Sequence, residues 1–256
     1  MRRMGIAAAT AAVVVVAAAA VANAITYGEP DGNRHPEVGA LLAPHAYSDG
    51  TWEACSGTLI AARVFLTAAH CDLGVTRVAV TLDSSYDPAT GTTYWGTWHA
   101  DPAFNQAQGD PHDVAVVIFD KAVRGIAPAR LPAAGSLANL PKDQKFTPVG
   151  YGAQSVTMGP GGANFHYADI RYMAVGTLEA INPSWLRLSM NPTLGDGGTC
   201  YGDSGGPNFL GAGATETNIV AATTVTGDFP CRSTNVDYRM DTTSARSFLA
   251  QYVTLP

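Results

Sequence analysis

The stretch Cys200-Tyr201-Gly202-Asp203-Ser204-Gly205-Gly206-Pro207 decides how the rest of the chain is interpreted. Its three glycines allow backbone turns that a side chain would forbid, and they let another molecule approach the backbone closely. Successive backbone N–H groups in such a turn can stabilise a developing negative charge. The serine is therefore a candidate nucleophile beside an oxyanion-binding turn. The alternative is a glycine-rich surface turn that happens to contain a serine.

The composition indicates a folded protein with many loops. The chain has 256 residues, of which 46% are hydrophobic and 14% are charged, with 27 glycines and 16 prolines. These values are typical of one large or two small folded domains rather than of a disordered chain. The formal net charge of -6 argues against a nucleic-acid partner, because phosphate binding requires a basic surface.

The N-terminal segment 1–24 has the pattern of a signal peptide. Two arginines precede an apolar run over residues 6–22, and Ala22-Asn23-Ala24 supplies small residues for cleavage. A transmembrane anchor is the alternative, but the run is mostly alanine and no positive cluster follows it. We expect a secreted, extracellular protein that starts at Ile25 and has no stable membrane anchor.

Secretion predicts that the four cysteines form two disulfide bonds, because the compartment is oxidising. Sequence alone permits three pairings. The sequential pairing, Cys55–Cys71 and Cys200–Cys231, closes the shortest loops and is the one expected. No C-x-x-C pair occurs, so a structural zinc site is not indicated. We expect no metal or other cofactor.

Short apolar or alternating stretches, bounded by Gly, Pro, Asp and Ser, recur along the chain and predict β-strands. The clearest is Val114–Phe119, a continuous apolar run with β-branched residues. Further strands are predicted over Val38–Leu42, Ser56–Ala61, Val64–Ala69, Val75–Leu82, Thr92–His99, Phe146–Gly150, Tyr167–Leu178, Trp185–Met190, Asn218–Thr226 and Val236–Met240.

Only one segment has convincing helical spacing. Residues 244–253 follow Asp241-Thr242-Thr243, which can cap a helix. The passage 127–141 is rich in proline and alanine and divides the chain into similar halves. We therefore expect an N-terminal domain over residues 25–130 and a C-terminal domain over residues 131–256.

A serine nucleophile needs an adjacent base that is itself oriented by a third group. Of the six histidines, His70 ends an apolar strand, and a disulfide at Cys71 would hold it in place. Asp113 stands at the start of the most apolar run and is the candidate orienting carboxylate. Taken singly, His70 is more simply interpreted as a packed histidine and Asp113 as a turn residue at the edge of a strand. The order of the three residues along the chain must therefore show whether they act together.

Chain order separates the folds that use such residues. Gly202-x-Ser204-x-Gly206 also satisfies the nucleophile elbow of α/β-hydrolases, which include lipases and esterases, but their histidine follows the serine. The last histidine of this chain is His166, so the elbow interpretation fails. A subtilisin-like order places Asp before His on a parallel sheet, and the strand-rich pattern opposes it. The order His70, Asp113, Ser204 fits the one remaining chain order of these three residue types, His before Asp before Ser, in an all-β protein.

The chain resembles the chymotrypsin-like (trypsin-fold) serine peptidases, in particular secreted bacterial members. The resemblance covers essentially all of residues 25–256. It is carried by Cys55-Ser56-Gly57-Thr58-Leu59-Ile60, Leu66-Thr67-Ala68-Ala69-His70-Cys71, Asp113-Val114-Ala115-Val116, Gly150-Tyr151-Gly152 and Gly202-Asp203-Ser204-Gly205-Gly206-Pro207. It implies an all-β fold of two antiparallel six-stranded β-barrels with a C-terminal α-helix and the site between the barrels.

The same resemblance implies a secreted serine endopeptidase that hydrolyses peptide bonds through an acyl-enzyme on Ser204. His70 would act as general base and then general acid, and Asp113 would orient it. The backbone N–H groups of Gly202 and Ser204 would form the oxyanion hole. The expected partner is a protein or peptide substrate, and the expected state is a monomer. A catalytically inactive trypsin-fold binding protein and an esterase using the same three residues are the alternatives.

The family's activation device also has a match in this chain. In the family, a new Ile-type N-terminus pairs with the aspartate that precedes the catalytic serine. Here these positions are Ile25 and Asp203. Signal-peptide cleavage after Ala24 would then produce the activating terminus directly, and loss of either partner of such a buried ion pair would be strongly destabilising.

The primary pocket departs from the pattern of trypsin. The floor position that is acidic in trypsin is Gly198, so a preference for Lys or Arg is not predicted. The resemblance places Val236 on the pocket wall, where a branched side chain favours small or medium apolar groups. A register shift of one residue would instead bring Asp237 into the pocket. Ala221-Ala222-Thr223-Thr224 stands where the family has S-W-G in the wall strand.

Overall fold

Strands dominate the computed structural model, which describes residues 25–256; the expected signal segment lies outside these residues. No helix within the described residues is long and apolar enough to cross a membrane. The strands are β1 (Glu29–Pro30), β2 (Val38–Leu42), β3 (Glu53–Ala61), β4 (Val64–Thr67), β5 (Arg77–Thr81), β6 (Tyr94–Ala100), β7 (Ala115–Phe119), β8 (Lys145–Gly150), β9 (Ser155–Gly159), β10 (Gly162–His166), β11 (Tyr172–Met173), β12 (Gly176–Ile181), β13 (Trp185–Ser189), β14 (Pro207–Leu210), β15 (Val220–Gly227) and β16 (Thr234–Arg239).

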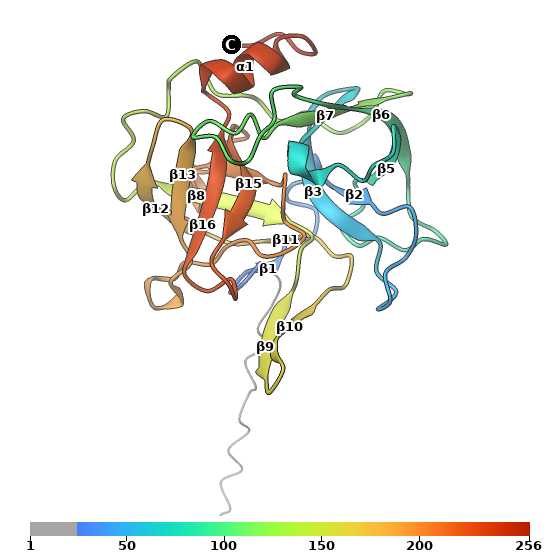
Figure 1. The fold of residues 1–256 in the computed structure, drawn as a ribbon, viewed down its shortest axis with the longest axis horizontal. Coiled ribbons are helices and arrows are strands. Elements are labelled where there is room, and N and C mark those ends of the chain that lie inside the picture. The colour runs from blue at the N-terminus through green and yellow to red at the C-terminus, as the bar shows by residue number, and fades with distance from the viewer. Residues whose placement is uncertain (1–24) are drawn as a thin grey trace, which may run out of the picture.

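The first six-stranded barrel is built from the N-terminal half of the chain (Figure 1). Its antiparallel strands close in the order β2-β3-β4-β7-β6-β5. Buried apolar side chains from the strands fill the interior, among them Leu41, Leu59, Phe65, Val80 and Phe119. In a closed barrel, inward-facing residues alternate with outward-facing ones along each strand, so these side chains supply the apolar centre.

The second barrel is formed by the order β8-β12-β13-β16-β15-β14, and pairing of β14 with β8 closes it. Leu137, Phe146, Leu178, Leu186 and Leu188 pack inside it. Helix α1 (Thr243–Leu249) follows β16, and the Thr242 side chain caps it by accepting a hydrogen bond from the N–H of Ala245. The predicted all-β architecture of two six-stranded barrels with a C-terminal helix is therefore confirmed.

A shared apolar cluster joins the two barrels. It combines side chains of the first barrel with side chains of the second and of the terminal helix, including Leu66, Val116, Val149, Phe209, Tyr238 and Phe248. The N-terminal segment also crosses between the halves, because β1 pairs with β11 beside the second barrel. Residues at the start of the predicted 25–130 domain thus complete the sheet of the other domain.

A β-hairpin of β9 and β10 projects from the second barrel (Figure 1). The sequence patterns did not predict these strands, because the Gly-rich segment 159–163 obscures the alternation on either side of the turn. The predicted single strand Tyr167–Leu178 is wrong. The chain there forms the short strand β11 and then β12, which starts at Gly176 and runs to Ile181.

Candidate active site

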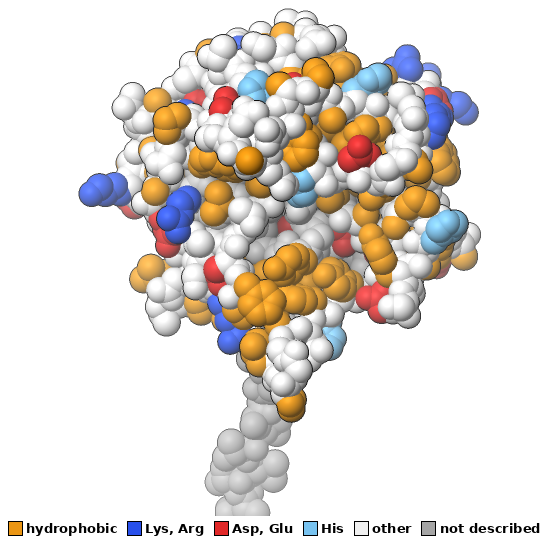
Figure 2. All heavy atoms as spheres, in the orientation of Figure 1, with side chains coloured by type: hydrophobic (Ala, Val, Ile, Leu, Met, Phe, Trp, Pro, Cys, Tyr) orange, Lys and Arg blue, Asp and Glu red, His pale blue; other side chains and the backbone are white. Residues whose placement is uncertain are grey.

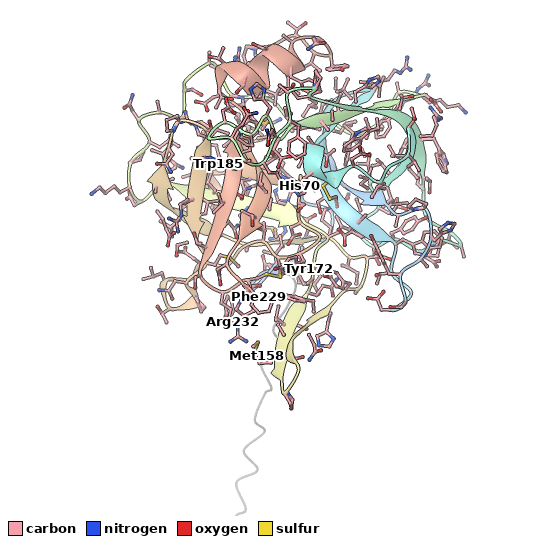
Figure 3. The ribbon with its side chains drawn as sticks, viewed as in Figure 1. His70, Met158, Tyr172, Trp185, Phe229 and Arg232 are labelled. Carbon is pink, nitrogen blue, oxygen red and sulfur yellow. A yellow bond between two sulfur atoms is a disulfide. The ribbon has the colours of Figure 1, made fainter. Side chains whose placement is uncertain are left out.

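The pairing of β4 with β7 brings two of the candidate residues together. The strands are antiparallel, and Thr67 at the end of β4 lies opposite Ala115 at the start of β7. The residues after Thr67 form a short 3-10 turn, Ala69–Cys71, that contains His70. Asp113 lies two residues before Ala115, so the register places it beside the same turn. Figure 3 shows His70 where the two barrels face each other.

Asp113 holds His70 at two points. One carboxylate oxygen, Oδ1, accepts the backbone N–H of His70 at 2.9 Å, and Oδ2 lies 2.7 Å from the imidazole Nδ1. The Asp113 side chain is fully buried, whereas the His70 side chain is 18% exposed. A carboxylate at Nδ1 places the proton on that nitrogen and leaves Nε2 free to accept a proton.

The loop that carries Ser204 is fixed against the first barrel by Ser56 on β3. The Ser56 N–H donates to the carbonyl of Ser204 at 2.8 Å, and its hydroxyl donates to the carbonyl of Gly202 at 3.1 Å. Gly202 and Gly205 have φ values of +96° and +77°, which side chains rarely adopt. A Cβ on Gly205 would also lie 2.2 Å from the Thr67 hydroxyl. Glycine is therefore required at both positions.

Ser204 and His70 line one cavity of about 260 Å³, which we call the primary cavity. Among the described residues, the hydroxyl of Ser204 has no hydrogen-bond partner, and neither do the backbone N–H groups of Gly202 and Ser204. His70 Nε2 likewise makes no hydrogen bond to Ser204 in this conformation. Hydrogen bonds between a nucleophile and its base are often long before substrate binds and shorten in the substrate complex. The open arrangement of His70 and Ser204 is therefore compatible with proton transfer from the serine hydroxyl to Nε2.

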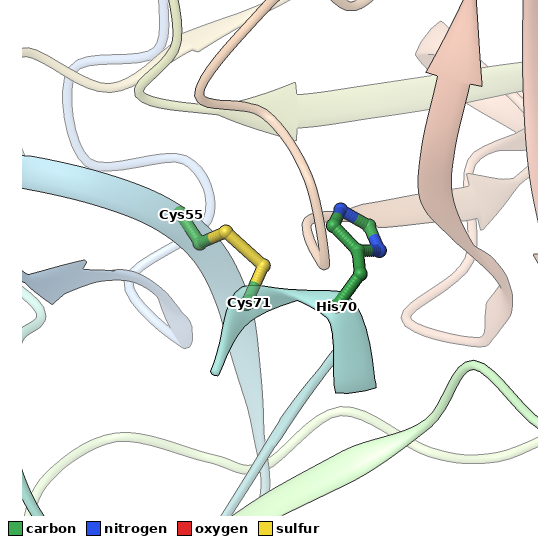
Figure 4. A group of neighbouring side chains, drawn as sticks. All are labelled: Cys55, His70 and Cys71. Carbon is green, nitrogen blue, oxygen red and sulfur yellow. A yellow bond between two sulfur atoms is a disulfide. The ribbon is translucent and has the colours of Figure 1, made fainter. Parts of the chain in front are cut away.

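Two disulfide bonds flank the site. Cys55–Cys71 lies next to His70, and Cys200–Cys231 joins two segments that line the primary cavity. The expectation of two disulfides is supported, and the bonds join the sequential pairs. Figure 4 shows that His70 and Cys71 share one turn and that the disulfide ties this turn to Cys55 on the neighbouring strand. Ligand atoms of Cys55, His70 and Cys71 lie within 4.8 Å of one another, but the bonded sulfurs are not available as thiolate ligands for a metal.

Residues 36–248 match the family model for trypsin. The chain belongs to the trypsin family. It is 28% identical over 198 residues to two proteins of Manduca sexta, trypsin alkaline C and trypsin alkaline A, and the match covers 69% of this chain and 72% of each relative. These relatives come from an insect, so the expected bacterial type stays a prediction.

Solved structures of other proteins share the trypsin fold of this chain. An HL collagenase structure superposes with a TM-score of 0.66 at 20% identity, covering 88% of this chain and 96% of the other. Neuropsin, a serine protease of mouse brain, superposes with a TM-score of 0.64 at 20% identity, covering 88% and 97%. Human heparin binding protein superposes with a TM-score of 0.64 at 16% identity, covering 88% of this chain and 95% of the other. At these identities the likeness concerns the fold alone.

The wall of the primary cavity differs from the one expected for this trypsin-family chain. It is formed by β15 residues from Thr224 onward and by the loop to Asp228; of the segment 221–224, only Thr224 lines the cavity. Neither Gly198 nor Val236 is among the residues that line the cavity. A Cβ on Gly198 would instead meet Met190 and Asn235 at 2.7 and 2.8 Å.

The two acidic residues near this wall do not present free carboxylates to the cavity. Asp237 is fully buried outside it and accepts a hydrogen bond from the Asn208 amide at 3.0 Å. Burial raises the pKa of Asp237 well above its ordinary value. Asp228 does line the cavity, but its carboxylate accepts the backbone N–H groups of Arg232, Ser233 and Thr234.

The two residues of the predicted activation pair occupy separate buried environments in the structure. Ile25 is fully buried and packs with Tyr172 and Ala174. The Asp203 carboxylate, also fully buried, accepts the N–H groups of Gly152 and Cys200, each at 2.8 Å. Burial raises the pKa of Asp203 to about 7 despite these two hydrogen bonds. Among the described residues, no cation pairs with this carboxylate.

An aromatic cluster at the edge of the primary cavity was not predicted from the sequence. The Phe165 ring of β10 packs edge-on against the Tyr201 ring, with 4.7 Å between the ring centroids. The centroid of the Phe229 ring lies 6.0 Å from that of Phe165. Tyr201 and Phe229 are 51% and 62% exposed. Figure 2 shows a hydrophobic patch below the hollowed centre of this face, in the region where Figure 3 labels Phe229. The three rings of this cluster come from separate segments of the chain. No local sequence pattern therefore predicts that they meet.

Proposed function

We propose that this trypsin-family chain is a secreted serine endopeptidase. The single observation that carries the proposal is the two-point contact of Asp113 with His70 in the cavity that also contains Ser204. Ser204 Oγ attacks the scissile carbonyl while His70 Nε2 takes its proton. His70 then returns a proton to the leaving amine, and water hydrolyses the acyl-enzyme by the same route.

The oxyanion of the tetrahedral intermediate is stabilised by the backbone N–H groups of Gly202 and Ser204. Among the described residues, neither N–H group donates a hydrogen bond, so both are available to the oxyanion. Ser56 also fixes the loop that carries them by bonding to the carbonyls of Gly202 and Ser204. Preorganised donors of this kind lower the barrier because they need no reorganisation during the reaction.

The Ile25 ammonium activates the enzyme after signal-peptide cleavage by pairing with Asp203. Support comes from the buried Asp203 carboxylate, whose raised pKa of about 7 shows that its two backbone donors do not compensate for burial. A neighbouring ammonium would favour the ionised form and lock the loop that carries the oxyanion donors.

The primary cavity accepts a neutral substrate side chain of small or medium size. Its wall presents Thr224, Val225 and Thr226, and Gly198, at the position of trypsin's acid, lies outside the cavity lining and brings no charge to it. Asp228 directs its carboxylate toward the backbone N–H groups of the turn that follows it, which weakens its attraction for a substrate Lys or Arg.

A peptide library tests this function directly. The secreted wild-type protein and its Ser204→Ala variant are incubated with the library, and the products are sequenced by mass spectrometry. We expect internal cleavage by the wild type only, after neutral side chains. Identical products from both proteins would show that the nucleophile is wrongly assigned. Hydrolysis of ester substrates without any peptide cleavage would favour the esterase alternative, and no turnover at all would favour an inactive binding protein.

A further inference from the structure

A second cavity lies next to the proposed oxyanion donor Gly202, outside the primary cavity. It has a volume of about 350 Å³ and is bordered by Tyr47, Asp49, Glu53, Ala54, Tyr167 and Gly202. We call it the acidic cavity. Figure 2 shows acidic atoms recessed in the hollow of this face.

Glu53 is the unusual residue of the acidic cavity. It is only 4% exposed, and among the described residues its Oε1 has no hydrogen-bond partner. Its backbone is held in place because the Asp169 carboxylate accepts the Glu53 N–H at 2.9 Å. The carboxyl group lies against Gly202, where an added Cβ would be 2.8 Å from each of its oxygens. Burying a carboxyl group without a partner is costly, which indicates that a ligand completes the site.

The surroundings of Glu53 suit a cation. Asp49 at the cavity rim is exposed, and hydrogen bonds from Thr51 lower its pKa, so it is ionised at neutral pH. Tyr47 and Tyr167 border the same space, and aromatic rings attract cations. Burial, together with the nearby carboxyl groups of Asp203, Asp169 and Asp49, raises the pKa of Glu53 well above its ordinary value. This raised pKa favours the protonated form of Glu53 in the empty cavity, and a bound cation would favour release of the proton.

The position of the acidic cavity tells which part of a substrate can reach it. This step rests on the proposed function, in which His70 gives a proton to the leaving amine. The leaving group must therefore lie on the side of His70 and the adjacent Cys55–Cys71 disulfide. Glu53 and Ala54 directly precede Cys55 on β3. An extended peptide advances ~3.3 Å per residue, and successive side chains point to opposite sides, so either of the first two leaving-group residues could enter the cavity.

We propose that the acidic cavity binds a Lys or Arg side chain of the substrate on the leaving-group side of the scissile bond. Glu53 pairs with the ammonium or guanidinium group, Asp49 adds a second negative charge, and Tyr47 and Tyr167 flank the alkyl stem. The enzyme then selects a neutral side chain on the acyl side and a basic side chain on the leaving side.

Paired peptide substrates test this site. The acyl side is kept constant, and each of the first two leaving-group positions is varied among Lys, Arg, norleucine and Glu. At one of these positions, we expect the wild-type kcat/KM to be about tenfold higher for Lys or Arg than for norleucine. Glu53→Gln should bring this ratio close to one, Asp49→Asn should lower it partly, and Glu179→Gln, an exposed acid on β12, should leave it unchanged. An unchanged ratio in Glu53→Gln would overturn the proposal.

A binding experiment separates this inference from the proposed function. Calorimetry with the Ser204→Ala variant measures the affinity for the Lys and norleucine peptides in two buffers of different ionisation enthalpy. We expect tighter binding of the Lys peptide with release of a proton, and loss of that release in Glu53→Gln/Ser204→Ala. Equal affinities would overturn the acidic cavity as a cation site. A Lys preference in binding without any turnover by the wild type would contradict only the peptidase function.

Discussion

The carboxylate of Asp113 contacts both the backbone N–H and the imidazole Nδ1 of His70, at 2.9 and 2.7 Å. Because one side chain bonds both the main chain and the ring, the orientation of the imidazole is coupled to the turn that carries it. The buried position of Asp113 keeps water from competing for these bonds. This relationship makes His70 the only described histidine with a catalytic geometry beside a candidate serine.

Asp113→Asn should reduce kcat by about 10⁴-fold while leaving the protein folded, because the amide stabilises the wrong imidazole tautomer. Steady-state kinetics on the best library peptide, together with circular dichroism, measure both effects. Asp120→Asn is the matched control, since Asp120 lies at the other end of β7 and pairs with the exposed Arg77. A comparable loss of kcat in both variants would contradict the assigned role of Asp113.

The N-terminus should control both stability and activity. With Ala24 retained, the pKa of Asp203 is about 7, raised from 3.8 by burial. A raised acid pKa means that the folded state loses stability as the pH rises from about 4 through 7. In a chain that starts at Ile25, the ammonium removes this loss, so its free energy of unfolding at pH 7 should exceed that of the Ala24 form by about 3 kcal/mol.

Chemical denaturation of the Ile25 and Ala24 forms at pH 4 and pH 7 measures this difference, and peptide hydrolysis should be faster in the Ile25 form. Equal stability and equal activity at pH 7 would rule out the Ile25–Asp203 pair. The Asp203→Asn variant supplies the control, because its two N-terminal forms should no longer differ in the way their stability depends on pH.

His35 should make the stability of the protein sensitive to alkaline pH. It contacts the Asp31 carboxylate through Nδ1 and lies 2.7 Å from Glu216 through Nε2, and its side chain is 5% exposed. Burial lowers its pKa, but the hydrogen bonds and charges of both carboxylates outweigh burial and raise the pKa from 6.5 to about 9. A raised histidine pKa contributes stability that is complete below about pH 6.5 and is lost as the pH rises through 9.

Between pH 6 and pH 10 the wild type should therefore lose about 3 kcal/mol of unfolding free energy more than His35→Gln. Urea denaturation across this range measures the difference. His166→Gln is the comparison variant, because His166 is exposed on β10 and its imidazole contacts only the Thr157 hydroxyl among the described residues. Parallel pH profiles for the wild type and His35→Gln would contradict the charged state of His35.

Loss of the Cys200–Cys231 bond should impair the site more than loss of the other disulfide. The bond spans 31 residues and joins two segments that line the primary cavity. Cys200→Ala/Cys231→Ala should lower the free energy of unfolding by about 3 kcal/mol and should raise KM for peptides. Cys55→Ala/Cys71→Ala is the reference, and equal KM values in the two double variants would contradict a role of Cys200–Cys231 in shaping the cavity.

The barrels and the three candidate catalytic residues could be predicted because local signals specify them. The buried run Val114–Phe119 forms β7 almost as predicted, and the motifs around His70 and Ser204 are short and contiguous. The pocket could not be predicted, because it depends on strand register. A shift in the pairing of β15 with β16, between Thr224 and Thr226, determines which wall residues face the cavity.

Glu53 shows a second limit of sequence reasoning. An acid at the start of a strand is ordinarily exposed, and nothing in the segment before Cys55 indicates burial. Its environment arises only when the Ser204 loop packs on β3 and brings Gly202 against the carboxyl group. The segments that create the acidic cavity are distant in sequence, so its existence follows from the fold alone.

Covalent labelling of Ser204 tests the central claim most directly. A fluorophosphonate reacts with a serine only when a neighbouring base and an oxyanion hole activate it. Intact-mass and peptide mass spectrometry of the Ile25 form should show one label per molecule, located on Ser204, and labelling should be lost in His70→Ala. Absence of labelling, or labelling of Ser204 that persists unchanged in His70→Ala, would contradict the account.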